Sequence, residues 1–418
     1  MDRHTITGLV FGLLGVALIA GVAPAISGTS RRFNLEPPPD PVGIGFHPPT
    51  WVVAIGILHL VTTILSFAPH GIRRWAGLAR IMSAISLVPL MLVLSLALSE
   101  TRSTNITNLL FTSLVLATPY ALGATTGLWS ERSGIINIGI EGTMLAAAGI
   151  GYMTYVTIGS AHSTGWLWFS ILIAVLAGGL VATLHAVLCI RFNVNQIVSG
   201  VVINLFALGL TGFLRSEVIV KSGITTGVGT SEFSLPLLSS IPVVGDQLFR
   251  GRPIYWMMYL VVLGTWVVMF RTPWGLRVRS CGENPRAAET LGVDVVRIRY
   301  QSVILGGLIA GLAGAWFSME QQSRFEDNMT NAAGFIALAA LIFGKWTPWG
   351  AFGGALLFGF SRALGSRIQF LDVEVKGFGI PSEFLQSLPF IVTLVVVAGA
   401  VGRSIPPAAA GQSFRRSG

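Results

Sequence analysis

The chain has 418 residues, of which 52% are hydrophobic and only 11% are charged. A soluble domain carries about 25% charged residues, so this composition excludes a soluble enzyme, a disordered chain and a nucleic-acid-binding protein. The formal net charge is +9, but the basic residues are scattered among long apolar runs and do not form one basic surface. The 50 glycines suit closely packed membrane helices. We therefore predict an all-α, polytopic membrane protein.

Apolar segments divide the chain into candidate membrane helices. A crossing of roughly 30 Å of hydrocarbon needs about 17–25 residues. Two shorter apolar pieces, 332–344 and 347–360, form either two thin crossings or one re-entrant hairpin. With both counted as crossings, about 12 segments are predicted. The ten longer segments are 7–26, 51–68, 81–98, 107–127, 135–158, 166–190, 197–215, 254–270, 301–319 and 386–402.

The charges of the connecting loops predict the orientation. With 12 crossings both termini lie on one side, and the loops on that side hold 16 Lys/Arg against five Asp/Glu. The opposite side, with the adjoining segment ends, holds 11 Lys/Arg and 12 Asp/Glu. Basic loops are retained in the cytoplasm. Both termini are therefore predicted to be cytoplasmic, in a multi-pass protein of the plasma (inner) membrane.

Three parts of the chain are distinguished. Residues 1–104 form an N-terminal extension with about three spans, residues 105–402 form the transmembrane core, and residues 403–418 form a cytoplasmic tail. The longest predicted outer loop, 216–253, is either a connector or a docking surface for an external partner. Its length, beyond the usual connection, favours docking.

The sequence lacks the common catalytic motifs. Gly344–Lys345–Trp346 does not continue into a phosphate-binding loop, since that motif needs Ser or Thr after the lysine. No pair of His or Cys has the spacing of a metal site, and Cys189 and Cys281 are too few for a disulfide framework. His59 and His185 lie in apolar segments and are interpreted as packed side chains. We predict a transporter or channel with no catalytic residue, metal or cofactor in this chain.

Polar residues recur at helical spacing within the segment that begins near residue 133. Ser133, Asn137 and Glu141 are four residues apart, which predicts one shared helix face. Glu141 is the only acidic residue inside a predicted span, and a carboxylate there normally faces a bundle interior or a wet cavity. Three roles stay open for Glu141: a structural hydrogen bond to backbone, contact with a transported solute, or proton coupling.

A second polar stripe lies at the start of the predicted segment 197–215. Gln196, Gly200 and Asn204 are again four residues apart. Their amides would either hydrogen-bond a polar solute or tie neighbouring helices together. Asn137, Glu141, Gln196 and Asn204 are thus the candidates for lining a substrate pathway.

The longest predicted cytoplasmic loop, 271–300, contains signals for a short helix. Asn284 is a favourable N-cap, Pro285 suits the first helical position, and Gly292 suits the C-terminal stop. This helix of about six residues is either a solvated connector or a rigid element that fits a groove on a cytoplasmic partner. An isolated helix this short is marginal, so its careful capping favours the partner contact.

Five ordered motifs resemble the permease subunits of nucleoside-type ABC importers, within the branched-chain amino acid, ribose and simple-sugar permease group. The resemblance covers about residues 105–402, and the form of the first motif is similar to the nucleoside branch. The motifs are Ser133–Gly134 with Asn137 and Glu141–Gly142; Asn195–Gln196–Ile197–Val198–Ser199–Gly200 with Asn204; Thr272 to Gly292; Gly306–Gly307 with Ala310 to Gly314; and Gly344–Lys345–Trp346–Thr347–Pro348–Trp349–Gly350.

The resemblance implies a function and a set of partners. Such permeases pair with a second permease, bind ABC ATPase subunits that hold ATP and Mg, and receive solute from an extracytoplasmic substrate-binding lipoprotein. The 195–204 pattern looks closer to one of two paralogous permeases, which implies a heterodimer. The residues that resemble the ATPase-coupling helix are Gly282, Glu283, Asn284, Pro285, Ala287, Ala288 and Gly292.

These observations predict a permease subunit that imports nucleosides or related compounds, driven by a separate ATPase through loop 282–292. One alternative keeps the importer and changes the cargo to a simple sugar or another small polar metabolite. A second alternative is an ATP-independent channel or ion-coupled carrier. It agrees with the missing phosphate-binding loop, but leaves the capped loop and the ordered motifs unexplained.

Overall fold

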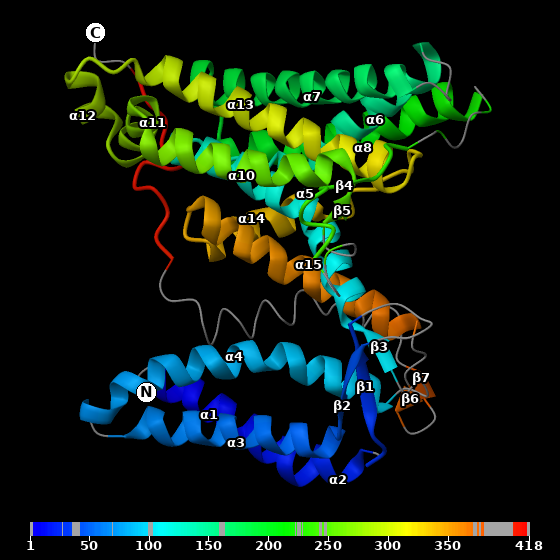
Figure 1. Cartoon of the computed structure of the whole chain (residues 1–418). Helices are drawn as coiled ribbons and strands as arrows, with labels where there is room; N and C mark the ends of the chain where they lie inside the picture. The colour runs from blue at the N-terminus through cyan, green and yellow to red at the C-terminus, as the bar shows by residue number, and fades with distance from the viewer. Residues whose placement is uncertain are drawn as a thin grey trace. The chain divides into compact units, whose positions relative to one another are not determined.

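The computed structural model is predominantly helical (Figure 1). Its described residues form two compact units. The first unit draws on 1–113, 235–249 and 360–403, and the second on 114–234, 250–359 and 404–418. The structure describes residues 3–26, 28–35, 42–68, 70–98, 103–158, 164–221, 223, 227, 229–241, 245, 249–370, 374–375, 378–379 and 404–415.

The first unit combines long helices with a small sheet. Its sheet has the order β2-β1-β3, with β1 antiparallel to β2 and parallel to β3. The phenyl rings of Phe33 and Phe46 stack across β1 and β2 at 4.1 Å. These strands were not predicted from the sequence. The elements are α1 (Arg3–Val16), η1 (Ala17–Val22), α2 (Ala23–Ala25), β1 (Arg31–Asn34), β2 (Gly43–Phe46), α3 (Pro48–Phe67), α4 (His70–Leu98), β3 (Ser103–Asn105), β6 (Glu374–Val375) and β7 (Phe378–Gly379).

The second unit holds most of the predicted core. The boundaries between the two units fall within helices α5 and α15, so each of these helices belongs to both units. Its elements are α5 (Ile106–Arg132), α6 (Ile140–Ile158), α7 (Thr164–Ala186), η2 (Val187–Arg191), α8 (Gln196–Leu214), η3 (Arg215–Val220), β4 (Phe233–Ser234), β5 (Arg250–Gly251), α10 (Pro253–Arg271), α11 (Pro273–Glu283), α12 (Pro285–Thr290), α13 (Val295–Ala315), η4 (Trp316–Gln321), α14 (Ala333–Phe343) and α15 (Pro348–Phe370).

Proline marks the beginning of many of these helices. Among the helices that the structure describes, five start at a proline: Pro48, Pro253, Pro273, Pro285 and Pro348. The fixed φ of proline suits the first helical position, where the backbone N–H has no helical partner in any case. The η elements are π-helical turns that extend α1, α7, α8 and α13, and such turns occur often at functional sites.

Helices α7 and α13 lie side by side along their length in the second unit (Figure 1). A Cβ atom built on Gly178 of α7 would lie 2.5 Å from the Gly307 carbonyl oxygen and from Gly311 Cα of α13. Only glycine permits this backbone approach. This approach agrees with the close helix packing that the high glycine content predicts.

Seven helices in the described part of the chain are long and apolar enough to cross a membrane. The predicted segment 386–402 lies outside the described residues, and the count of about 12 spans is not confirmed. Helix α14 has 11 residues, about 16 Å at 1.5 Å per residue, which is shorter than the hydrocarbon core. The seven candidates are Gly8–Ala25, Pro48–Phe67, Ile106–Arg132, Thr164–Arg191, Gln196–Val220, Pro253–Arg271 and Val295–Gln321.

Candidate functional site

A non-helical segment, residues 133–139, separates α5 from α6. We call it the break. Gly134 has a φ of +97°, in the left-handed region that ends helices. The prediction that Ser133, Asn137 and Glu141 share one continuous helix face was therefore wrong. Irregular backbone at membrane depth needs partners from the surrounding protein or from a wet cavity.

The amides of α8 supply such partners. The Gln196 Oε1 atom accepts a hydrogen bond from the Ile136 N–H at 2.7 Å. Asn204 Oδ1 accepts from the Gly142 N–H at 2.7 Å, and Asn204 Nδ2 donates to the Ile138 carbonyl at 3.1 Å. The two polar stripes predicted from the sequence thus meet, and the second stripe hydrogen-bonds the backbone of the first.

A histidine of α7 joins the same region. The ring of His185 is 1% exposed, which confirms its interpretation as a packed side chain. Its Nε2 atom lies 3.0 Å from the Ile136 carbonyl oxygen and its Nδ1 atom 3.0 Å from Ser199 Oγ. The backbone carbonyl requires Nε2 to be the donor of the first contact. Helices α7 and α8 therefore both contribute to holding the break.

The Glu141 carboxylate lies at the N-terminus of α14. Its Oε1 atom accepts hydrogen bonds from Thr330 Oγ1 at 2.6 Å and from the Ala332 N–H at 3.0 Å. Its Oε2 atom accepts from the Gly334 N–H at 2.6 Å. A carboxylate is favoured there because it satisfies unpaired helical N–H groups and faces the positive end of the helix dipole. These contacts support the structural role for Glu141.

Asn137 differs from the other three pathway candidates. It is 2% exposed, and its Oδ1 atom has no hydrogen-bond partner among the described residues. An unpaired buried carbonyl oxygen is unfavourable and uncommon. A water molecule or a polar group of a solute would satisfy it.

Two further buried carboxylates belong to this unit. Glu131 and Glu320 are 7% and 2% exposed and lie within candidate spans, so the prediction that Glu141 is the only acidic residue inside a span was wrong. Glu320 accepts hydrogen bonds from the N–H groups of Ile254 at 2.7 Å and Tyr255 at 3.0 Å, at the start of α10. The sequence did offer a sign of these two residues, because each glutamate lies within about one turn of the predicted end of an apolar segment.

The end of α5 also holds the motif around Trp346. The Glu131 Oε2 atom accepts a hydrogen bond from Trp346 Nε1 at 2.5 Å. The Arg132 guanidinium donates to the Trp346 carbonyl from Nε at 2.9 Å and from Nη2 at 2.7 Å. Lys345 and Trp346 have positive φ values of 52° and 51°. These contacts fix an unusual turn between α14 and α15.

The capped helix predicted in loop 271–300 is confirmed as α12. Asn284 Oδ1 accepts the Ala287 N–H at 3.1 Å, and Gly292 has a φ of +80°. The predicted coupling residues differ in accessibility: Ala287 is exposed, whereas Ala288 is 2% exposed. Gly282 of α11 packs directly against the Arg132 backbone. Only part of this set therefore has exposed side chains.

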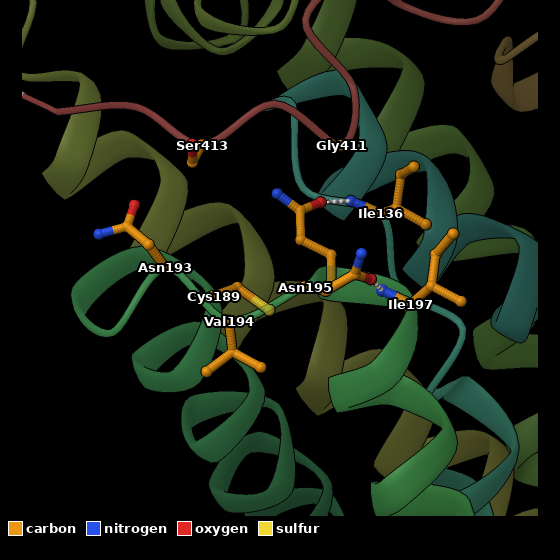
Figure 2. Close-up of a pocket in the computed structure, with 9 residues that line it drawn as sticks. Ile136, Cys189, Asn193, Val194, Asn195, Ile197, Gly411 and Ser413 are labelled. Carbon is orange, nitrogen blue, oxygen red and sulfur yellow. Dashed lines mark hydrogen bonds between the residues drawn. The ribbon is translucent and has the colours of Figure 1, made fainter.

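A cavity of about 290 Å³ lies between the break, the start of α8 and residues 411–413. Figure 2 shows the Asn195 side chain over the first turn of α8, where its Oδ1 atom accepts the Ile197 N–H at 3.0 Å. Gln196, Asn193 and Ser413 also line the cavity. Irregular backbone and amide side chains therefore lie next to a cavity in this region.

The break, the capped helix α12 and the long apolar helices agree with the class of membrane permease subunits. Residues 109–398 match the family described as the branched-chain amino acid transport system permease component. The chain belongs to this family. No solved structure matches the chain.

Curated relatives refine the comparison. The chain is 37% identical to the nucleoside ABC transporter permease protein NupC of Lactococcus lactis subsp. cremoris (strain MG1363), over 73% of this chain and 95% of the relative. It is 38% identical to the guanosine ABC transporter permease protein NupQ of Bacillus subtilis (strain 168), over 72% and 94%. It is 34% identical to the putative glucose ABC transporter permease protein TsgC13 of Haloferax volcanii, over 74% and 97%.

Proposed function

We propose that this chain is the transmembrane subunit of an ABC transporter that imports nucleosides or related compounds. The observation that carries the proposal is the identity of 37% and 38% to NupC and NupQ, which are named as nucleoside and guanosine permeases, across nearly their whole lengths. The family membership favours this function over an ATP-independent channel or an ion-coupled carrier.

The proposal includes the partners expected from the sequence. Two ATPase subunits hold ATP and Mg, a paralogous permease completes a heterodimer, and an extracytoplasmic lipoprotein delivers the solute. Loop 282–292 contacts the ATPase, with both chain termini in the cytoplasm. The exposed side of α12 and its capping by Asn284 support this contact.

The four pathway candidates receive different roles in this proposal. Asn137 contacts the solute, because its buried Oδ1 atom has no partner within the described ranges. Gln196 and Asn204 keep the break open to the pathway by holding its backbone. Glu141 fixes the start of α14 beside them.

A simple sugar is the second candidate cargo. The 34% identity to TsgC13, named as a putative glucose permease, supports it. Both cargo classes carry hydroxyl groups, which can donate hydrogen bonds to an amide oxygen. The nucleoside proposal is preferred because two relatives with higher identity are named for nucleosides.

The test begins with the tagged chain purified in mild detergent from its native membrane. An ABC ATPase and a second permease in stoichiometric amounts are expected; a chain purified alone would contradict the proposal. The complex is then reconstituted in liposomes with its lipoprotein, and uptake of labelled guanosine and labelled glucose is compared. ATP-dependent uptake of guanosine, unaffected by excess glucose, is expected. The reverse preference would establish the sugar alternative.

A further inference from the structure

Residues 404–415, near the C-terminus, cross the junction of α11 and α12. We call this segment the strap. The Ala409 N–H donates to the Gly282 carbonyl at 2.8 Å, and the Ala408 N–H donates to Glu283 Oε2 at 3.3 Å. A cavity of about 580 Å³ separates the rest of the strap from the first turn of α12. The strap is therefore anchored to the segment that we assign to ATPase contact.

The same strap is bonded to the break. The Gly411 N–H donates to the Gly134 carbonyl at 3.1 Å. Gly411 has a φ of +80°, and a Cβ atom at this position would lie 2.9 Å from Ile136 Cδ1. Figure 2 shows Gly411 passing over Ile136, the residue whose N–H is held by Gln196. The two anchor points are separated by one residue of the strap.

Arg299 of α13 connects the strap and the break a second time. Its guanidinium donates from Nε to the Ser133 carbonyl at 3.1 Å and from Nη1 to the Gln412 carbonyl at 3.1 Å. It also lies 5.8 Å from the centre of the Phe414 ring, a cation–π contact. Arg299 is 2% exposed. A buried guanidinium requires fixed acceptors, so it holds both carbonyls in place.

These contacts form a continuous mechanical connection. A movement of α11 and α12 either breaks the bonds at Gly282 and Glu283 or displaces the strap. A displaced strap either breaks its bonds to Gly134 and Arg299 or displaces the start of the break. Coupling between distant sites is carried by such chains of hydrogen bonds and packed groups.

We propose that the strap couples the ATPase-facing helices α11 and α12 to the break, with Arg299 as its positioning residue. This inference rests on the proposed function, because it assumes that an ATPase moves α12. It adds a segment, residues 404–415, and a residue, Arg299, to the machinery that relays ATPase motion.

The experiment measures hydrogen exchange of the backbone amides in residues 133–139 of the complete complex. Exchange is compared in the resting complex and after ATP and vanadate trap the ATPase. In the unmodified chain, trapping is expected to change the exchange rate by at least about threefold, since local opening governs exchange. Failure of the ATPase to co-purify would refute the proposed function; an unmodified complex that does not respond to trapping refutes only the strap.

Two independent variants interrupt the strap. Gly411→Val places a side chain against Ile136 at a positive φ, and Arg299→Gln removes the charge that holds both carbonyls. Each is expected to reduce the response of residues 133–139 to trapping to less than about a third, with the ATPase still bound. Arg299→Lys, which keeps the charge, is expected to restore part of the response.

The matched control is Gly264→Val in α10, where a Cβ atom meets nothing within 4 Å in the described part of the structure. In this variant, trapping of the ATPase should change hydrogen exchange in residues 133–139 as much as in the unmodified chain. The proposal is overturned if Gly411→Val and Arg299→Gln, each in a complex with bound ATPase, also respond as the unmodified chain does. It is equally overturned if the control loses its response to the same extent.

Discussion

The carboxylate of Glu141 accepts the N–H of Gly334 at 2.6 Å, so a side chain in the first turn of α6 closes the first turn of α14. A Cβ atom on Gly334 would lie 2.5 Å from the Glu141 backbone nitrogen, and the two helix starts are therefore in direct contact. The Glu320 carboxylate likewise accepts hydrogen bonds in the first turn of α10, from the N–H groups of Ile254 and Tyr255. Buried carboxylates in this unit thus organise helix ends that have no nearby cap in the sequence.

The first prediction concerns Glu141→Gln. The amide keeps the size of the side chain but lacks the charge and one of the two acceptor oxygens. Hydrogen bonds to a charged group contribute about 1.5–3 kcal/mol each, so we expect a loss of roughly 1–3 kcal/mol and a lower melting temperature in detergent. Glu326→Gln is the control: it alters an exposed ion pair with Arg324, and we expect a change below about 0.5 kcal/mol. An unchanged melting temperature together with lost uptake would instead indicate a transport role.

Asn204→Leu tests the backbone contacts of the break. The substitution leaves the Gly142 N–H and the Ile138 carbonyl without their partner. An unpaired buried group costs about 1–3 kcal/mol, and we expect poor recovery of folded protein and early thermal unfolding. Leu205→Ala, at the next position and 65% exposed, should change stability by less than about 0.5 kcal/mol. Equal stability of the two variants would contradict the proposed function of Asn204.

Asn137→Leu is not expected to destabilise the protein, in contrast to Asn204→Leu. Its Oδ1 atom is buried with no partner in the described residues, so replacement by an apolar side chain of similar size removes an unsatisfied group. Stability should stay the same or increase. If Asn137 contacts the solute, ATP-driven nucleoside uptake should fall by about tenfold, the equivalent of one hydrogen bond. A fall in melting temperature without a change in uptake per folded complex would contradict this assignment.

The sequence could predict features that depend on neighbours along the chain. The cap of α12 at Asn284 follows from local chemistry and is confirmed. The close helix packing expected from the many glycines is present at Gly307. The position of the break at residues 133–139 was not predicted, because four-residue spacing continues through Gly134 while its backbone adopts a left-handed φ. The roles of Glu131 and Glu320 depend on partners more than 60 residues away, Trp346 and Ile254. No periodicity in the sequence records such partners.

Cys281 provides a chemical test of the α11 packing. Its side chain is buried, and burial raises the pKa of the thiol to about 11. A raised pKa leaves the thiol protonated at neutral pH, with the reactive thiolate increasing only as the pH approaches 11. We expect maleimide labelling at pH 8 to be at least about 100 times slower than at an engineered Leu291→Cys on the same loop. Leu291 is 84% exposed, and comparable rates at the two positions would show that α11 does not pack as described.

The final prediction separates docking from folding in α12. Ala287 is exposed whereas Ala288 is 2% exposed, so a bulky charged residue has different effects at the two positions. Ala287→Arg should change the free energy of unfolding of the chain by less than about 0.5 kcal/mol, because surface substitutions are tolerated. It should also reduce co-purification of the ATPase by at least about tenfold if α12 fits a groove on that partner, since a large charge in a close interface is strongly unfavourable.

Ala288→Arg should destabilise the chain itself, because overpacking a buried site costs about 1–3 kcal/mol before the added charge is counted. Thermal unfolding and quantitative co-purification are therefore measured for both variants. Full ATPase recovery with Ala287→Arg would place the contact elsewhere on the chain. Loss of ATPase with Ala287→Arg at unchanged stability would show that the exposed side of α12, beside the Asn284 cap, is where the partner binds.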